Sequence, residues 1–369
     1  MGRSLSIAMI GSRGIPTAYS GIETALGELC PRLVARGLRV RVYGRVAYRL
    51  PPSYLGVEVL RLPSWKTKHL DTLSHVAVSL LHALGSDFEI IHFHALGPTL
   101  LAWLPRLCRR KVVATVQGLD WQRAKWGRVA RRVLQMAEAT SVRFPHRTIV
   151  VSQTLKQHYE TRYRVPVEYI PNGVSLPELH SPRLITQAFG LRGADYILFT
   201  GRLVPEKRCH DLIQAFGRLR SDLALVIAGE GSHTEAYVAR LKAEASSRVI
   251  FSGHVTGELL AELYSNAYLY VLPSELEGLS LSLLEAMSYA RCAVVSDIPE
   301  NLEVVRDAGA SFPVRDRDQL AKVLQELIAD PERVSAYGRL ARERVAKEYG
   351  WESIAERTEQ VYRSLIPGS

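Results

Sequence analysis

The sequence predicts an α/β protein made of two doubly wound domains, each with a parallel sheet that helices cover on both faces. Short apolar runs rich in β-branched residues alternate with amphipathic stretches along all 369 residues. Some runs, such as 149–151, are continuously apolar, as strands buried on both faces are. A chain of this length also suits two domains of ordinary size.

The expected strands form two successive series, one in each half of the chain. The first series covers 5–11, 39–46, 57–62, 88–94, 111–117, 148–152 and 167–170. The second covers 196–201, 223–229, 249–253, 267–272, 292–296 and 310–314. Helices are expected over 21–36, 127–139, 209–220, 258–265 and 280–289. Within 127–139, Val129, Val133 and Met136 recur at i, i+4 and i+7, which is the spacing of one face of an amphipathic helix.

The boundary between the domains is expected within 171–192, which contains Pro171, Pro177 and Pro182 and no strong strand pattern. The sequence therefore predicts an N-terminal Rossmann-like domain over 1–175 and a C-terminal Rossmann-like domain over 193–348. The last stretch, 349–369, is expected to form a helix that packs back toward the N-terminal domain.

Composition excludes several classes of protein. With 47% hydrophobic and 23% charged residues, the chain can bury a sizeable core, so it is neither disordered nor collagen-like. Its four cysteines are widely separated, which predicts core thiols in a reducing compartment and neither a zinc site nor a disulfide framework. The start shows no signal-peptide pattern, and the longest apolar stretches are too short to span a bilayer. A cytoplasmic location is expected, either in solution or on a membrane surface.

The positive charge is concentrated in the first half. Residues 1–180 contain 25 Lys and Arg against 11 Asp and Glu, whereas residues 181–369 contain 22 against 26. Such an imbalance indicates a partner rather than a fold. The candidates are an anionic membrane, a polyanionic substrate or nucleic acid, and a basic chain without a specific partner is the remaining alternative.

Loops at the carboxyl ends of strands are where open α/β sheets bind ligands. The first loop, 11–16, has two glycines that permit close approach of a ligand, although an ordinary turn also explains them. It lacks the Gly-x-Gly-x-x-Gly fingerprint of dinucleotide binding. The second loop, 201–207, places Arg202 and Lys207 near a helix expected to begin just after Pro205. Two cations there suit a diphosphate, and a solvated surface pair is the alternative.

The third loop, 273–287, carries the strongest pattern. Glu277 lies in the loop and Glu285 lies on the following helix, so the two carboxylates can bracket a ligand the size of a nucleotide sugar. Between them, the backbone amides of residues 278–280 can face an anion. The neighbours of Glu285 are apolar, so its carboxylate needs a hydrogen-bond partner.

These motifs resemble the family 4 retaining glycosyltransferases of GT-B fold. The resemblance rests on Glu-x7-Glu at 277–285, on Gly-Arg-Leu with Glu-Lys at 201–207, on Ile-Pro-Asn-Gly-Val at 170–174 and on Ala-Gly-Glu-Gly at 228–231. The stretches 11–24 and 118–126 are similar to a bacterial subgroup that includes rhamnosyltransferases, which build surface polysaccharides on lipid carriers.

The resemblance implies a role for each matching residue. Glu277 would bind hydroxyls of the transferred sugar, and Arg202 and Lys207 would hold the donor diphosphate. Glu285 would bind the ribose, and the backbone amides of Gly278, Leu279 and Ser280 would bind the phosphate or the sugar. His254 and Val255 would face the base, and Gly14 of the N-terminal domain would face the diphosphate. Asp120 is a further catalytic candidate, and residues near the acceptor or sugar are Gln117, His94 and Arg13.

Two departures from the family pattern affect these roles. Gln117 stands where many members have His, and Gln cannot act as an acid or base. Arg208 stands where a glycine is frequent. His92 and His94 lie at a strand end, where ordinary structural hydrogen bonding is the main alternative to a role in the reaction.

The resemblance implies transfer of a sugar from dTDP-rhamnose or a UDP-sugar to an acceptor hydroxyl, expected on a lipid-linked glycan, with retention of configuration. No cofactor and no metal are expected, because Arg202, Lys207 and a helix dipole can stabilise the leaving diphosphate. Asp316-Arg317-Asp318 matches an Asp-x-Asp metal motif, but helix capping explains it. The alternatives are a nucleotide-sugar epimerase, a phosphorylase or a non-catalytic nucleotide-sugar-binding protein.

Two basic segments of the first half bear on the location of the protein in the cell. One contains Trp121, Arg123, Lys125 and Trp126 and continues into Arg128, Arg131 and Arg132, and the other is 106–111. Cations attract anionic lipid headgroups, and tryptophans settle at the bilayer interface. We therefore expect peripheral association with the inner face of the membrane and, since no nucleic-acid motif is present, no nucleic-acid partner.

Overall fold

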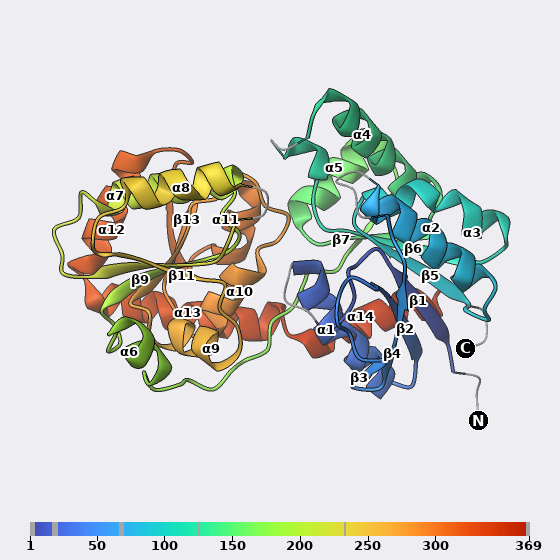
Figure 1. Cartoon of the computed structure of the whole chain (residues 1–369), viewed down its shortest axis with the longest axis horizontal. Coiled ribbons are helices and arrows are strands. Elements are labelled where there is room, and N and C mark those ends of the chain that lie inside the picture. The colour runs from blue at the N-terminus through green and yellow to red at the C-terminus, as the bar shows by residue number, and fades with distance from the viewer. Residues whose placement is uncertain (1–3, 17–20, 66–69, 124–125, 232–233, 367–369) are drawn as a thin grey trace. The chain divides into compact units, whose positions relative to one another are not determined.

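The computed structural model describes residues 4–16, 21–65, 70–123, 126–231 and 234–366. These residues form two compact units (Figure 1). Unit 1 combines Met1–Gly173 with Trp351–Ser369, and unit 2 is Val174–Gly350. Lys125 of the first basic segment lies outside the described residues.

Unit 1 is built on a sheet in the order β3-β4-β2-β1-β5-β6-β7-β8. Its pairings are parallel except for the short antiparallel pair β3–β4. The strands are β1 (Ser6–Ile10), β2 (Arg39–Arg45), β3 (Ser53–Tyr54), β4 (Val57–Leu62), β5 (Ile90–His94), β6 (Lys111–Val116), β7 (Arg147–Val150) and β8 (Glu168–Tyr169).

Helices cover both faces of this sheet, because alternate residues of each strand point to opposite sides. Ile7 and Met9 of β1 join the core beneath α1 and α14, whereas Ala8 and Ile10 join the core beneath α2 and α3. The helices of unit 1 are α1 (Gly21–Ala35), α2 (Asp71–Leu84), η1 (Gly97–Leu101), α3 (Trp103–Leu107), η2 (Asp120–Gln122), α4 (Arg128–Arg143), α5 (Gln153–Tyr163) and α14 (Trp351–Arg363). The chain end thus packs on α1 within unit 1.

Unit 2 contains an all-parallel sheet in the order β11-β10-β9-β12-β13-β14. The strands are β9 (Tyr196–Thr200), β10 (Ala224–Ala228), β11 (Val249–Gly253), β12 (Leu269–Leu272), β13 (Ala293–Ser296) and β14 (Gly309–Phe312). The helices are α6 (Leu184–Phe189), η3 (Pro205–Lys207), α7 (Cys209–Phe216), α8 (Glu235–Glu244), α9 (Gly257–Asn266), α10 (Leu281–Ser288), α11 (Pro299–Val305), α12 (Arg317–Ile328) and α13 (Pro331–Glu348).

Strand order reverses once in each sheet. In unit 2, the chain proceeds outward from β9 through β10 to β11, and then crosses to β12 and proceeds the other way. In unit 1, the same change of direction occurs between β1 and β5. Loops leave such neighbouring strands in opposite directions, which opens a crevice at their carboxyl ends. The loops singled out in the sequence follow β1, β9 and β12.

Several helices begin at residues whose side chains cap them. The Ser152 hydroxyl accepts a hydrogen bond from the Leu155 amide at 3.2 Å at the start of α5. Asp330 accepts from the Arg333 amide at 3.0 Å and precedes Pro331 at the first position of α13. Such caps satisfy amides that lack a partner inside the helix. They fix where these crossover helices begin relative to the sheets.

The structure confirms the two strand series and both parallel sheets, and it corrects other expectations. The two units meet at Gly173 and Val174, within the 171–192 stretch, and the rest of that stretch contributes α6 to unit 2, where the carboxylate of Glu262 accepts from the Ile185 amide at 3.0 Å. Cys108 is exposed, so the prediction that all four cysteines are core thiols was wrong. The helix predicted from the spacing of Val129, Val133 and Met136 is present as α4, and these three side chains are exposed.

Gly173 provides a test of how α14 is held in unit 1. A Cβ atom at this position would lie 2.6 Å from the Trp351 ring and 2.8 Å from Ile354. We expect Gly173→Ala to destabilise unit 1 by about 1–3 kcal/mol, because the tightly packed α14 would have to shift. Thermal unfolding of the variant measures the effect.

The matched control is Gly27→Ala in the middle of α1, where a Cβ meets nothing within 4 Å. This substitution should stabilise unit 1 by about 0.5–1 kcal/mol through helix propensity. Equal shifts of the melting temperature in the two variants would contradict the packing account.

Candidate functional site

The candidate site lies in unit 2 at the reversal between β9 and β12. The loop after β9 carries Arg202 and Lys207, and the loop after β12 carries Glu277. A backbone hydrogen bond of 2.9 Å from the Glu275 amide to the Glu206 carbonyl joins the two loops. This bond holds Lys207 and Glu277, which are 70 positions apart in the sequence, at the same edge of the sheet.

Lys207 and Glu277 form a direct ion pair across these loops. The Lys207 Nζ atom lies 2.5 Å from Oε1 of Glu277, and the side chains are only 14% and 10% exposed. Low exposure reduces solvent screening, so the pair is held more firmly than a surface salt bridge. The arrangement places a cation and a hydrogen-bond-accepting carboxylate beside each other.

The turn between Lys207 and α7 differs from the expected helix start. The 3-10 helix η3 occupies 205–207, and Arg208 then adopts a left-handed conformation with φ of 54° before α7 begins at Cys209. This conformation explains why glycine is favourable at the position. Arg208 is held there by Asp211, at 2.6 Å from its Nε atom, and by Glu275 at 3.4 Å.

Glu285 has the partner that its apolar surroundings require. Its Oε2 atom accepts a hydrogen bond of 2.9 Å from the hydroxyl of Tyr264 on α9. The same hydroxyl lies 2.6 Å from the Thr200 hydroxyl at the end of β9, and the Tyr264 ring stacks on Tyr289 with centroids 5.4 Å apart. Thr200, Tyr264 and Glu285 therefore form a connected chain from the end of β9 to α10.

Two further parts of unit 2 complete the predicted donor site. Gly278, Leu279 and Ser280 immediately precede α10, whose N-terminal end favours anions. His254 is exposed and Val255 half-buried, and the His254 amide donates to the carboxylate of Glu230 at 3.3 Å. Glu230 thus fixes the loop after β11 to the loop after β10.

Sequence reasoning missed Glu300, which directly follows β13 at the first turn of α11. Burial raises the pKa of the Glu300 carboxyl above its ordinary value, and the charges of Glu277 and Glu303 raise it further. The rule that ligand-binding residues follow strand ends would have found Glu300, whereas no signal marked Tyr264 within its helix.

In unit 1, the loop after β1 is anchored by a buried acid. Oε1 of Glu23 accepts from the Arg13 amide at 2.9 Å, and the Gly14 amide donates to the Ser12 hydroxyl at 3.2 Å. At Gly11, with φ of 120°, a Cβ atom would lie 2.4 Å from the His94 carbonyl oxygen. Glycine is required there because the loop passes directly over the end of β5.

The histidines at the end of β5 are buried and hydrogen-bonded. His92 lies 2.7 Å from the Tyr362 hydroxyl of α14 and 2.7 Å from the Thr115 hydroxyl. Burial lowers the pKa of His92 well below its ordinary value and lowers the pKa of His94 to about 3. These contacts are those of neutral, structural histidines. Both rings line a small cavity that Gln117 also borders.

The remaining unit 1 candidates are engaged with neighbours. The Gln117 and Asn172 side chains exchange two amide hydrogen bonds of 2.8 and 3.3 Å, so Gln117 is tied to the stretch that leads out of unit 1. Asp120 pairs with Arg123 at 3.0 Å. The adjacent Trp121 donates its indole N–H to the fully buried Glu138 of α4 at 2.6 Å, which anchors the loop that carries Asp120.

Asp316 acts as a helix cap. Its carboxylate accepts from the amides of Asp318 and Gln319 at 3.1 and 2.9 Å, as the capping interpretation predicted. Within the described ranges, no group of three or more His, Cys, Asp or Glu side chains is placed to hold a metal ion.

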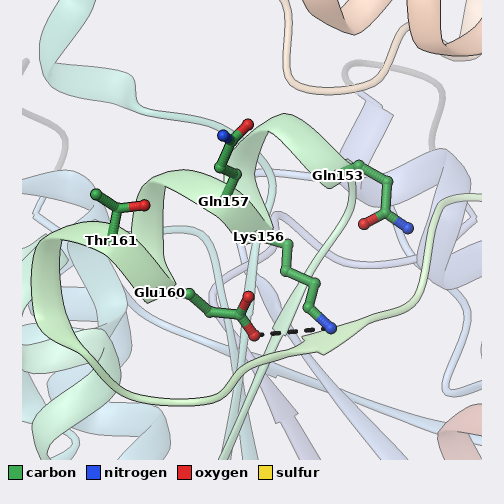
Figure 2. A pocket seen from close by; sticks show the side chains of 5 residues that line it. All are labelled: Gln153, Lys156, Gln157, Glu160 and Thr161. Atoms are coloured by element: carbon green, nitrogen blue, oxygen red, sulfur yellow. Dashed lines mark ion pairs between the residues drawn. The ribbon is translucent and has the colours of Figure 1, made fainter.

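A shallow surface hollow on α5 lies outside the candidate site (Figure 2). Gln153, Gln157 and Thr161 line it together with Lys156 and Glu160, which form an ion pair of 3.6 Å. Paired charges four residues apart are ordinary on a solvated helix face. The hollow is therefore not a second candidate site.

Two family models match the chain, one in each half. The model described as Glycosyltransferase Family 4 matches residues 19–178, and the model described as Glycosyl transferases group 1 matches residues 186–344. Alpha-maltose-1-phosphate synthase of Mycobacterium tuberculosis is 28% identical and aligns over 98% of this chain and 100% of its own. The rhamnosyltransferase subgroup is not identified by these matches.

Solved structures show the fold. Sucrose-phosphate synthase from Thermosynechococcus elongatus superposes with a TM-score of 0.85 at 24% identity, over 99% of this chain and 100% of that one. The Anabaena protein HepE in complex with UDP-glucose superposes with a TM-score of 0.83 at 18% identity, over 98% and 100%. The predicted GT-B fold is confirmed.

The buried histidines predict how unit 1 responds to acid. Because the folded pKa of His94 lies far below the unfolded value near 6.5, the unfolded state binds more protons at acidic pH. Stability should therefore be complete above pH 6.5 and fall by about 1.4 kcal/mol per pH unit for this residue as the pH drops toward 3. Melting temperatures of unit 1 between pH 7.5 and 4.5 measure this loss.

His94→Gln should make the pH dependence shallower, whereas His180→Gln at an exposed position of unit 2 should leave it unchanged. A wild-type melting temperature of unit 1 that is flat over this range would contradict the neutral, buried state of the histidine.

Proposed function

The chain belongs to the family 4 glycosyltransferases, and on this premise we propose that it moves a hexose from a nucleotide-diphosphate sugar to an acceptor hydroxyl with retention of configuration. The observation that carries the proposal is the Lys207–Glu277 pair, with Glu285 on the same loop–helix segment. A sugar diphosphate needs a cation for its phosphates and an acceptor for its hydroxyls, side by side.

The proposed donor contacts follow from this geometry. Arg202 and Lys207 would hold the diphosphate, and the amides of residues 278–280 would add hydrogen bonds at the N-terminus of α10. A diphosphate that engages Lys207 competes with Glu277 for its ammonium group. The Glu277 carboxylate is then free to accept hydrogen bonds from the sugar. Donor binding would thereby release the Glu277 carboxylate from Lys207 so that it can bind the sugar hydroxyls.

The other end of the donor would lie near Glu285 and the loop at 253–255. A carboxylate can accept both ribose hydroxyls, and the hydroxyl of Tyr264 fixes the rotamer of Glu285. His254 and Val255 would face the base, and Gly14 of unit 1 would face the diphosphate. The complex of the Anabaena protein with UDP-glucose makes UDP the first nucleotide to test, and dTDP is the second.

The proposed reaction is a front-face displacement that needs no protein nucleophile and no metal. The bond from the anomeric carbon to the β-phosphate oxygen breaks, and the bond to the acceptor oxygen forms on the same face. The acceptor proton passes to the departing phosphate oxygen. Arg202 and Lys207 stabilise the charge on the leaving group. Asp120, Gln117, His94 and Arg13 remain candidates near the acceptor, without an assigned proton transfer.

The proposed acceptor is a lipid-linked glycan at the inner face of the membrane. The support is the positive charge of the first half, where the 97–143 stretch contains ten Lys and Arg against two Asp and Glu. Within the described residues, no helix has the length and apolar character needed to cross a bilayer.

Calorimetric titration with UDP, dTDP and GDP tests the donor site. We expect Glu285→Ala to weaken binding of the preferred nucleotide by about tenfold or more, because a charge-assisted hydrogen bond contributes roughly 1.5–3 kcal/mol. Tyr264→Phe should weaken binding by a smaller factor, since it removes only the orientation of Glu285.

Tyr268→Phe is the matched control, because its hydroxyl donates to the Leu327 carbonyl at 2.9 Å and takes no part in the Tyr264–Glu285 bond. It should bind the nucleotide as the wild type does. If none of the three nucleotides binds the wild-type protein, the proposed donor site is wrong.

Transfer assays with the matching nucleotide sugar test the role of Glu277. Glu277→Gln should lower kcat by about tenfold to a hundredfold because the lost contact is to the transferred sugar, while the affinity for the free nucleotide should not fall, since Lys207 loses its competing partner. Chelators should not reduce the rate, and the product should keep the anomeric configuration of the donor by NMR. Wild-type turnover in this variant would refute the assignment.

An assay without acceptor separates the alternative reactions. A transferase gives only slow hydrolysis under this condition, whereas an epimerase forms its product without an acceptor. Donor binding without turnover across a panel of acceptors would instead indicate a non-catalytic binding protein.

A further inference from the structure

The outer face of α4 is apolar where a solvated helix would be polar. Val129, Val133 and Met136 are 78%, 41% and 62% exposed, and they follow one another along three successive turns. Single exposed apolar residues are common on protein surfaces, but an aligned stripe along a helix is not. These three residues are called the α4 stripe below.

The inner face of α4 fixes this orientation. The buried carboxylate of Glu138 accepts from Trp121 and lies 2.7 Å from Nε2 of His158 on α5. The Ala137 carbonyl accepts from the Thr99 hydroxyl of η1 at 2.8 Å. Rotation of the helix to bury the stripe would break these bonds and expose a carboxylate that the core now satisfies. The stripe therefore faces outward as a consequence of the packing.

Positive charge flanks the stripe. Arg128, Arg131 and Arg132 are exposed on the first turns of α4, and the single acidic residue of the helix, Glu138, is buried on the other side. The outer face thus combines apolar and cationic side chains without a compensating carboxylate of its own helix. This composition is typical of helices that lie in the interface of an anionic bilayer.

The neighbouring helix α3 continues the same chemistry. Leu107 is 73% exposed and Trp103 is 41% exposed one turn before it, and Arg106 and Arg109 are exposed beside them. The Arg106 guanidinium donates to the Phe144 carbonyl at the end of α4 at 2.8 Å, which joins the two helices. In Figure 1, α4 lies at the top of unit 1 and α3 at its right side.

We propose that α4, with α3 beside it, is the membrane-docking element, in which the α4 stripe enters the headgroup–acyl boundary of an anionic bilayer and the arginines bind lipid phosphates. This inference deepens the proposed function, because it names the surface through which a lipid-linked acceptor is reached. A second copy of the chain is a poorer occupant. A two-fold contact would bring the arginines of both copies together without acids to pair them.

The test is co-sedimentation of the full-length protein with vesicles of phosphatidylcholine alone or with phosphatidylglycerol, in the absence of donor and acceptor. The wild type should partition onto the anionic vesicles. Val129→Ser/Val133→Ser/Met136→Ser should reduce this partitioning at least tenfold, because it removes the inserting groups but leaves the charge. Arg128→Ser/Arg131→Ser/Arg132→Ser should abolish the preference for anionic vesicles.

Val46→Ser/Leu55→Ser is the matched control, because these two apolar residues of unit 1 are equally exposed at the edge of the sheet away from α4. It should bind vesicles within twofold of the wild type. All variants change exposed side chains, and unchanged thermal unfolding confirms that they are folded.

Cys108 provides a direct readout of insertion, because it is the exposed one of the four cysteines and follows α3. A thiol-directed environment-sensitive dye on this residue should shift to shorter wavelength on anionic vesicles and not on neutral ones.

Three results would overturn the proposal. The stripe variant could bind vesicles as the wild type does, which would show adsorption by charge alone. The wild type could fail to bind anionic vesicles at all. The wild type could form dimers that the stripe variant lacks, which would make the partner a second copy. None of these results depends on nucleotide binding, so the proposed function is tested separately by titration.

Discussion

The reversal of strand order between β9 and β12 is the constraint on which the candidate site depends. It makes the loops after these strands diverge over neighbouring positions of one sheet edge. The bond between the Glu275 amide and the Glu206 carbonyl then holds the loops together, and Lys207 meets Glu277. Without that reversal, the cation and the carboxylate would lie on unrelated parts of the surface.

Buried hydrogen bonds hold the side chains and loops of the candidate sites in fixed positions. Tyr264 connects Thr200 at the end of β9 with Glu285 on α10, so the carboxylate is fixed by a strand and by two helices. In unit 1, Glu23 and Glu138 do the same for the loops that carry Arg13 and Asp120. Each acid accepts hydrogen bonds from neighbouring groups, and Glu138 also lies 3.6 Å from the Arg162 guanidinium, which avoids the cost of an unpaired buried charge. The proposed ligand groups are thus positioned before any ligand arrives.

Unit 1 separates its functions by face. The side of its sheet beneath α1 and α14 buries His92, whose contact with Tyr362 links the strand end to the last helix. The other side is covered by α2 and α3, with α4 next to them, and these helices present apolar and cationic side chains outward.

The sequence by itself determined the two strand series, the parallel sheets and the loops that carry Arg202, Lys207, Glu277 and Glu285, because hydrophobic periodicity and strand-end position are local properties. Only the tertiary structure decided what those residues touch. Tyr264 gave no signal, since its partner lies 21 residues away, and the ion pair of Lys207 spans 70 residues. The outward orientation of the α4 stripe also depends on the tertiary structure. Periodicity shows that a helix has an apolar face, but the buried hydrogen bonds of Glu138 determine whether that face meets the core or the solvent.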